Sequence, residues 1–211
     1  MGLLKLLTSD PLAFALVAIP LLFSIIIHEV AHGWVAYKMG DPTAKWLGRL
    51  SLNPLKHLDP IGTLMLFLFG FGWAKPVPVN FNNISDRRKG LIFVSSAGIL
   101  ANILFAFLAL LCIRLFSTLP SGGALNLVFK VCHYVALINI TLAALNLIPI
   151  PPLDGSKILM GMASRGTQYL LSRLEPYGFF IIIAFLYLGI LNPLIGFFRW
   201  IIVSLISIVL P

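Results

Sequence analysis

The sequence predicts an all-α membrane protein with about five transmembrane helices and a re-entrant or short β-hairpin element between the first and second. Hydrophobic residues make up 59% of the 211-residue chain and charged residues only 10%, whereas an ordinary soluble domain carries roughly 25% charged residues. Several apolar runs also reach the ~20 residues that a helix needs to cross a bilayer. We expect one integral-membrane domain over 1–211, with its functional core at about 11–160.

The apolar runs place the helices along the chain. Four regions are long enough to form one helix or two: 11–37, 90–116, 131–150 and 177–210. The stretch "GILNP", from Gly189, is predicted to break the last region into two helices. "LPSGGAL", from Leu119, predicts a short loop. "SRGTQYLLSRLEP", from Ser164, predicts a polar connection with some amphipathic helical character.

The segment between the first and second helices is harder to assign. Its stretch "IGTLMLFLFGFGWAKPVPVNF", from Ile61, has an apolar part of about fourteen residues, which is short for a span but suits a re-entrant element. "KPVPVNF" alternates between polar and apolar residues, and its prolines exclude a central strand. An edge strand or a bulged hairpin is therefore expected here.

The positive charge of the chain predicts its orientation. In a membrane protein a net charge of +8 indicates basic loops facing the cytosol and anionic lipid rather than a nucleic-acid partner, and no nucleic-acid-binding pattern accompanies it. Basic residues gather in 38–89 and 151–176, while the other side has little beyond Lys5, Arg114 and Lys130. The positive-inside rule puts both basic loops in the cytosol and the amino terminus outside.

The most informative short motif is "HEVAH", which begins at His28 inside the first predicted helix. It matches H-E-x-x-H, and residues four apart lie on one face of a helix. His28 and His32 can therefore present two imidazoles to one ion. Zn²⁺ suits this set, because a catalytic zinc site keeps one position for water. Glu29, about a quarter turn aside, can take the proton of that water.

An alternative interpretation is that these histidines only form hydrogen bonds with neighbouring helices. Ionisable groups inside spanning helices are costly and usually functional, which favours the metal site. His28 lies about nine residues from the end of the apolar run, or ~14 Å at the rise of an α-helix. The site is thus expected inside the membrane, nearer the cytosolic face.

Asp154 is the candidate for a third metal ligand. It follows the third helix in "NLIPIPPLDGSKIL", from Asn146, where three prolines must unwind the backbone. Gly155 then permits a tight turn, after which a helix can restart. The alternative is an ordinary turn aspartate, and His57 would then be the next residue to consider as a ligand.

Helix parity supports this pairing. If the first helix enters the cytosol, the second returns outward and the third comes back in. The carboxyl ends of the first and third helices then meet on one side, which brings Asp154 toward His28 and His32. This holds only if the segment 61–74 does not cross the membrane.

With both motifs present, the chain resembles the site-2 protease family of intramembrane zinc metalloproteases. That family pairs H-E-x-x-H in one spanning helix with L-D-G at the end of another, here "HEVAH" and "LDG" at 153–155. "NLIPIPPLDG" is similar to the family's longer N-x-x-P-x-x-P-L-D-G form. The stretch from His32 resembles the compact bacterial branch without PDZ or CBS domains. "AGILAN" keeps Gly98 and Asn102, but Ile99 stands where the family often has proline.

The resemblance implies an activity and a set of roles. His28, His32 and Asp154 would hold one zinc ion, and Glu29 would activate the water. Asn146, or failing that Asn102, would stabilise the oxyanion; each can also be a simple interhelical hydrogen-bonding residue. The implied substrate is the transmembrane helix of another membrane protein, and the implied location is a bacterial cell membrane.

Two other function classes compete with the protease. A zinc transporter should carry histidines and carboxylates along several spanning helices, whereas this chain has only seven acidic residues. An inactive relative of the protease would have lost Glu29 or a ligand, and none of them is lost. The sequence therefore favours the protease.

Overall fold

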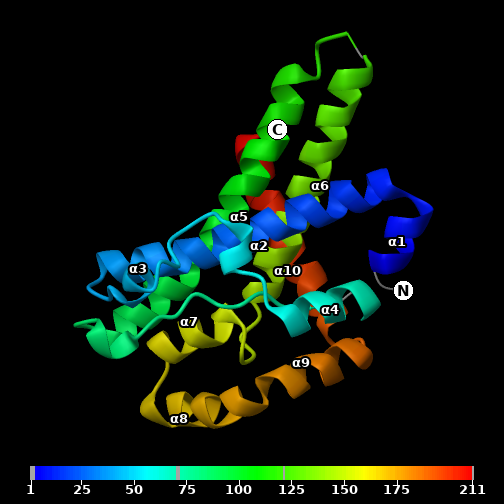
Figure 1. Cartoon of the computed structure of the whole chain (residues 1–211). Coiled ribbons are helices and arrows are strands. Elements are labelled where there is room, and N and C mark those ends of the chain that lie inside the picture. Colours follow the sequence, from blue (N-terminus) through cyan, green and yellow to red (C-terminus); the bar gives the residue numbers. More distant parts are fainter. Residues whose placement is uncertain (1–2, 70–71, 121, 211) are drawn as a thin grey trace.

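The structure is a computed structural model that describes residues 3–69, 72–120 and 122–210 (Figure 1). The described α-helices, in chain order, are α1 (Leu3–Ser9), α2 (Pro11–Lys38), α3 (Thr43–Trp46), α4 (Pro60–Phe69), α5 (Arg87–Phe116), α6 (Gly123–Asn146), α7 (Asp154–Met162), α8 (Arg165–Leu174), α9 (Gly178–Tyr187) and α10 (Leu191–Val209). Among the described residues, five stretches are long and apolar enough to cross a membrane: α2, α5, α6, the stretch Arg165–Tyr187 and α10. The all-α membrane class is confirmed.

Helix α2 begins and ends where local chemistry dictates. The side chain of Asp10 accepts a hydrogen bond from the Ala13 backbone N–H at 2.9 Å, and proline occupies the first helical position. Beyond the helix, Gly40 adopts a φ of +106°, a conformation that side chains rarely allow. The predicted span 11–37 matches this helix closely.

The third predicted span is shifted. Helix α6 covers Gly123–Asn146 rather than 131–150, so it starts earlier and stops earlier. The chain enters the helix directly after Gly122, within the stretch expected to be loop. It leaves before Pro149, because a proline disfavours helical geometry in the residue that precedes it. The second span, by contrast, ends at Phe116 as predicted.

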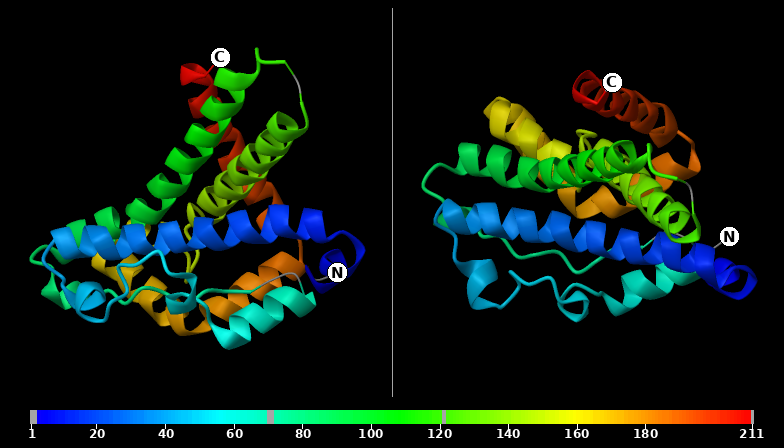
Figure 2. Two further views of the ribbon diagram at one scale, coloured as in Figure 1. Left: turned by 45° about the horizontal axis from the view of Figure 1, so that its top comes forward. Right: turned by 90° about the horizontal axis from the view of Figure 1, so that it is seen from above.

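Helix α5 is the centre of the packing and contacts α2, α6 and α7. The right-hand view of Figure 2 shows α5 on one side of α2, and α3 and α4 on the other. Small residues such as Ala106, Ala143 and Ala144 are fully buried where α5 meets α6. Small side chains let helix backbones approach closely, which is how membrane helices commonly associate.

The β-hairpin expected near residues 61–82 is wrong. Within the described part of this region the chain forms α4 and then an extended segment, 72–80, with one isolated antiparallel bridge between Leu58 and Ala74. Pro76 and Pro78 lack the N–H groups that a ladder needs, so regular pairing cannot extend. At ten residues, α4 is also shorter than a span requires.

Side chains hold the 72–80 segment in place of a sheet. The guanidinium of Arg49 donates to the carbonyl oxygens of Lys75 and Pro76, at 2.8 and 3.2 Å. The carboxylate of Asp41 accepts the Asn80 backbone N–H at 2.7 Å. Asp41 lies between α2 and α3, and Arg49 follows α3, so residues soon after the end of α2 hold the segment.

The last third of the chain agrees with its predicted outline. Helix α8 is the amphipathic connection expected after Ser164, and the final apolar region is broken into α9 and α10 at Gly189, whose φ is +72°. The short helix α1 was not predicted.

Candidate metal centre

Three buried side chains converge at the contact of α2 with α7. Nε2 of His28 lies 3.0 Å from Oδ2 of Asp154, and Nε2 of His32 lies 3.1 Å from the same oxygen. The two Nε2 atoms are 2.9 Å apart. All three residues are less than a tenth exposed. The structure thus brings together the three residues that the sequence offered as metal ligands.

The unwound turn before α7 delivers Asp154 to the histidines. Helix α6 ends at Asn146, and the chain turns through its prolines until α7 starts at Asp154 itself. Gly155 allows this path, since a Cβ atom there would lie 2.4 Å from the carbonyl oxygen of Leu147. The L-D-G motif is therefore a packing requirement as well as the source of a carboxylate.

Helix α5 orients both imidazole rings. Nδ1 of His32 lies 2.7 Å from the carbonyl oxygen of Val94, which can only accept, so this nitrogen carries the proton. Nδ1 of His28 donates to the side-chain oxygen of Asn102 at 2.6 Å. Each neutral ring then turns the lone pair of its Nε2 toward Asp154.

This arrangement fits a cation. With both rings neutral and protonated on Nδ1, two nitrogen lone pairs and the Asp154 oxygen face one another, and this oxygen has no hydrogen-bond donor among the described residues. Such a set is unfavourable when it is empty and favourable around a metal ion, and two imidazoles with one carboxylate are a donor set that Zn²⁺ takes at catalytic sites.

Gly98 makes room for the two rings. A Cβ atom at Gly98 would lie 2.6 Å from Cε1 of His28 and 2.6 Å from Nε2 of His32. We expect Gly98→Ala to displace the rings and to lower zinc affinity by at least the 10–100-fold that supporting residues typically contribute. Competition with a zinc indicator measures this. Gly196→Ala, where no atom lies within 4 Å, is the matched control, and equal zinc affinity in both variants would contradict the packing argument.

Glu29 lies beside this group, and its carboxylate is held by the 72–80 segment. Its Oε2 accepts the Val77 backbone N–H at 2.8 Å. Glu29 is half-buried, in contrast to the two buried histidines on either side of it in the motif. The structure thus places a carboxylate next to the histidines but outside the group that could hold a metal.

Comparison with known proteins shows which family the chain belongs to. The model of peptidase family M50 matches residues 114–189. YwhC of Bacillus subtilis, named as a zinc metalloprotease, is 38% identical over 185 residues, which cover 86% of this chain and 83% of YwhC. The chain belongs to peptidase family M50. Rip2 of Mycolicibacterium smegmatis and of Mycobacterium tuberculosis, also named as zinc metalloproteases, are each 31% identical, and the matches cover 85% of this chain and 69% and 71% of the relatives. No solved structure matches the chain.

In this M50 peptidase the two asparagines offered as oxyanion donors differ in their surroundings. Asn102 is fully buried, and besides accepting from His28 its amide nitrogen donates to Asn139 at 2.7 Å. Both polar atoms of its carboxamide are bonded to protein groups, and its oxyanion role stays a prediction. The amide nitrogen of Asn146 donates to Leu142 of its own helix at 3.0 Å, and its oxyanion role stays a prediction.

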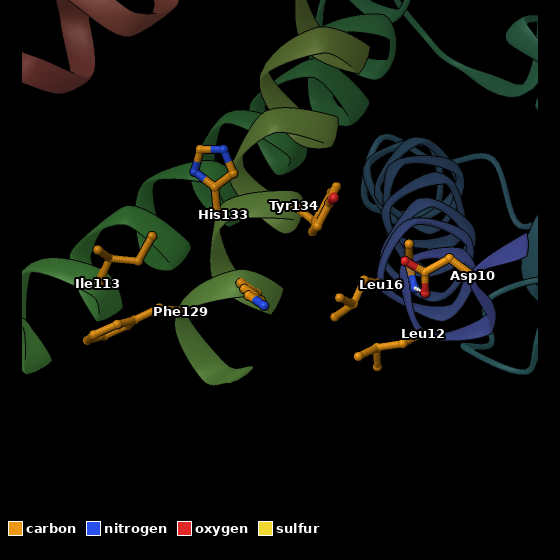
Figure 3. A pocket seen from close by; sticks show the side chains of 9 residues that line it. Asp10, Leu12, Leu16, Ile113, Phe129, His133 and Tyr134 are labelled. Carbon is orange, nitrogen blue, oxygen red and sulfur yellow. Dashed lines mark hydrogen bonds between the residues drawn. The ribbon is translucent and has the colours of Figure 1, made fainter. Parts of the chain in front are cut away.

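The remaining histidines of the M50 chain lie apart from the metal group. His57 is fully buried in the loop before α4, and its Nε2 donates to the carbonyl oxygen of Ser51 at 2.7 Å. His133 lines a recess of about 560 Å³ between α2, α5 and α6, together with Asp10 and Tyr134 (Figure 3). Neither histidine is placed to replace Asp154 as a ligand.

Sequence reasoning missed Ser24, Asn139 and the backbone N–H of Val77. Two signals could have found the side chains. Ser24 precedes His28 by one helical turn and shares its face, and Asn139 is a polar residue in the middle of an apolar span. The contact of Val77 with Glu29 has no signal in the sequence.

Proposed function

We propose that the protein is an intramembrane zinc metalloprotease, active as the single domain 1–211, that hydrolyses a peptide bond within or near the transmembrane segment of another membrane protein. The observation that carries the proposal is the meeting of three acceptors, His28, His32 and Asp154, beside the carboxylate of Glu29. Membership of family M50 supports the same reading. The transporter and inactive-relative alternatives are not favoured, because the ligand set and the base are all present.

The roles of the residues follow from their positions. His28, His32 and Asp154 would hold one zinc ion, which would supply a Lewis acid for the attacking water and the scissile carbonyl. Glu29 takes the proton of that water and can return it to the leaving amine. The Val77 N–H engages Oε2 of Glu29, so we assign the proton to the other carboxylate oxygen, Oε1. Asn146 is the proposed oxyanion donor, since its amide is tied only to its own helix.

An apolar cavity supports a path for the substrate. Its volume is about 500 Å³, and it lies between α2, α4 and the start of the 72–80 segment. Ile26, Leu66, Phe67 and Trp73 are among the side chains that line it. We propose that it receives apolar residues of the substrate, while the substrate unwinds and pairs with the extended 72–80 segment.

The proposed orientation puts the segment 38–89 on the cytosolic side, with the active site nearer that face. The clustering of basic residues in this segment supports it. Single cysteines introduced at Lys45 and at Arg88, both exposed, should react with a membrane-impermeant thiol reagent from the same face. Labelling from opposite faces would contradict the orientation and the helix parity on which it rests.

Metal removal tests the proposed activity. Purified protein in liposomes should cleave a single-span substrate, lose activity when zinc is chelated and regain it when zinc is restored, because the three ligands hold the only Lewis acid that the proposal invokes. Product formation that persists after complete removal of the metal would overturn the proposal.

A further inference from the structure

We propose that Asn139 on α6 is a positioning residue for the metal site, because it determines which nitrogen of His28 carries the proton. The inference rests on the proposed function, in which His28 is a zinc ligand. Asn139 lies on α6, a helix that carries none of the three metal ligands, and it would touch neither metal nor substrate.

A chain of buried hydrogen bonds connects the two residues. The Nδ1 of His28 is 2.6 Å from Oδ1 of Asn102, and Nδ2 of Asn102 is 2.7 Å from Oδ1 of Asn139. The Nδ2 of Asn139 is 2.8 Å from the carbonyl oxygen of Val135 and 2.8 Å from Oγ of Ser24. Asn102, Asn139 and Ser24 are all at most 3% exposed, so water does not compete for these bonds.

The direction of this chain is fixed at the Val135 end. A backbone carbonyl can only accept, so the Asn139 group facing Val135 must be the amide nitrogen. The side-chain oxygen of Asn139 therefore faces Asn102 and needs a donor. Asn102 must therefore donate from its amide nitrogen to Asn139, which leaves the side-chain oxygen of Asn102 facing His28. His28 can satisfy that oxygen only by carrying its proton on Nδ1.

The position of the proton on His28 decides whether its Nε2 can bind a metal. A neutral imidazole with its proton on Nδ1 has a lone pair on Nε2, and Nε2 is the atom that faces Asp154. Without the bond to Asn139, only the 3.3 Å bond to the Ser24 carbonyl oxygen would oppose a half-turn of the Asn102 carboxamide, and after that half-turn its amide nitrogen would face His28. The ring would then carry its proton on Nε2 and could not bind a metal through that atom.

Both ends of this chain of hydrogen bonds, His28 and Ser24, lie on α2. Ser24 lies one turn before His28 on α2, and its backbone carbonyl oxygen also accepts from Asn102 at 3.3 Å. The bonds therefore join α2, α5 and α6 around the ligand, and they hold the ring orientation through the contacts of these three helices. Residues that orient metal ligands typically contribute 10–100-fold to metal affinity.

Leucine and aspartate at position 139 separate this role from packing. Asn139→Leu fills the space but cannot accept from Asn102, whereas Asn139→Asp retains an acceptor oxygen. We expect zinc affinity to fall at least about tenfold in Asn139→Leu and to stay close to wild type in Asn139→Asp. The zinc dissociation constant and the absorption spectrum of the Co²⁺-substituted protein are the readouts. Asn126→Leu, an exposed position on the same helix, is the control.

If Asn139 only filled space, Asn139→Leu would bind zinc more tightly than Asn139→Asp, because leucine suits a buried apolar site and a carboxylate does not. Zinc binding that survives in Asn139→Leu would therefore overturn the inference. Equal loss in both variants would overturn it too. If Asn139→Leu does not fold, Asn139→Ala, which also lacks the acceptor oxygen, takes its place and is expected to lose zinc affinity by the same factor. Failure of the proposed function is distinguished by the wild-type protein, which would then bind no more zinc than His28→Ala.

Discussion

Glu29→Gln is expected to leave the protein folded and loaded with zinc but to lower cleavage by about 10²–10⁴-fold, the usual contribution of a general base. Glutamine has nearly the same size as glutamate. Its side-chain oxygen can still accept the hydrogen bond that the Val77 N–H donates to Glu29 at 2.8 Å. It cannot take a proton from water. Since Glu29 is not among the residues that could hold the metal, zinc content should not change.

Rates of product formation and zinc per chain, measured on the same purified sample, check this prediction. Glu175→Gln, the same change at an exposed site, is the control and should match wild type in both measurements. Full activity in Glu29→Gln would assign the base to another residue. Loss of zinc together with activity would instead make Glu29 a ligand or a structural support.

Asp154→Asn is expected to lose both metal and activity. The substitution removes the negative charge from a buried oxygen that lies 3.0 and 3.1 Å from the two imidazole nitrogens. A divalent ion in a poorly solvated site favours an ionised carboxylate, so zinc affinity should fall by more than the 10–100-fold typical of a supporting residue. Activity should fall with zinc occupancy.

The zinc dissociation constant and the activity at saturating zinc separate the two effects. Asp86→Asn is the control, because asparagine caps a helix as well as aspartate does and Asp86 caps α5. If Asp154→Asn keeps full zinc occupancy and cleavage, Asp154 is only a turn residue, whatever its proximity to the histidines.

Some of this architecture could be predicted because it is encoded locally. Asp10 and Pro11 mark the start of α2, and Pro149 stops α6 before the turn that delivers Asp154. The spacing of His28 and His32 places both on one face without any knowledge of the fold. Helix parity predicts the meeting of Asp154 with these histidines if α4, which is shorter than a span, does not cross the membrane.

Other features depend on contacts that no local pattern encodes. A polar residue in a span predicts a hydrogen bond but not its partner, so the contact of Asn102 with His28 could not be predicted, and the oxyanion role of Asn102 stays a prediction. The alternation in "KPVPVNF" suggested strand pairing, yet Pro76 and Pro78 prevent a ladder, and side chains from a distant loop hold the segment. The start of α6 was misplaced because Gly122 and Gly123 resemble a loop, although a helix can begin directly after them.

Mapping the cleavage site on a single-span substrate tests the central claim most directly. The wild-type protein, loaded with zinc in liposomes, is incubated with the substrate, and mass spectrometry identifies the new termini; Glu29→Gln serves as the blank. The account predicts a cut within the apolar span or a few residues from its end, absent from the blank. Cuts confined to the soluble flanks of the substrate, or equal products in the blank, would contradict it.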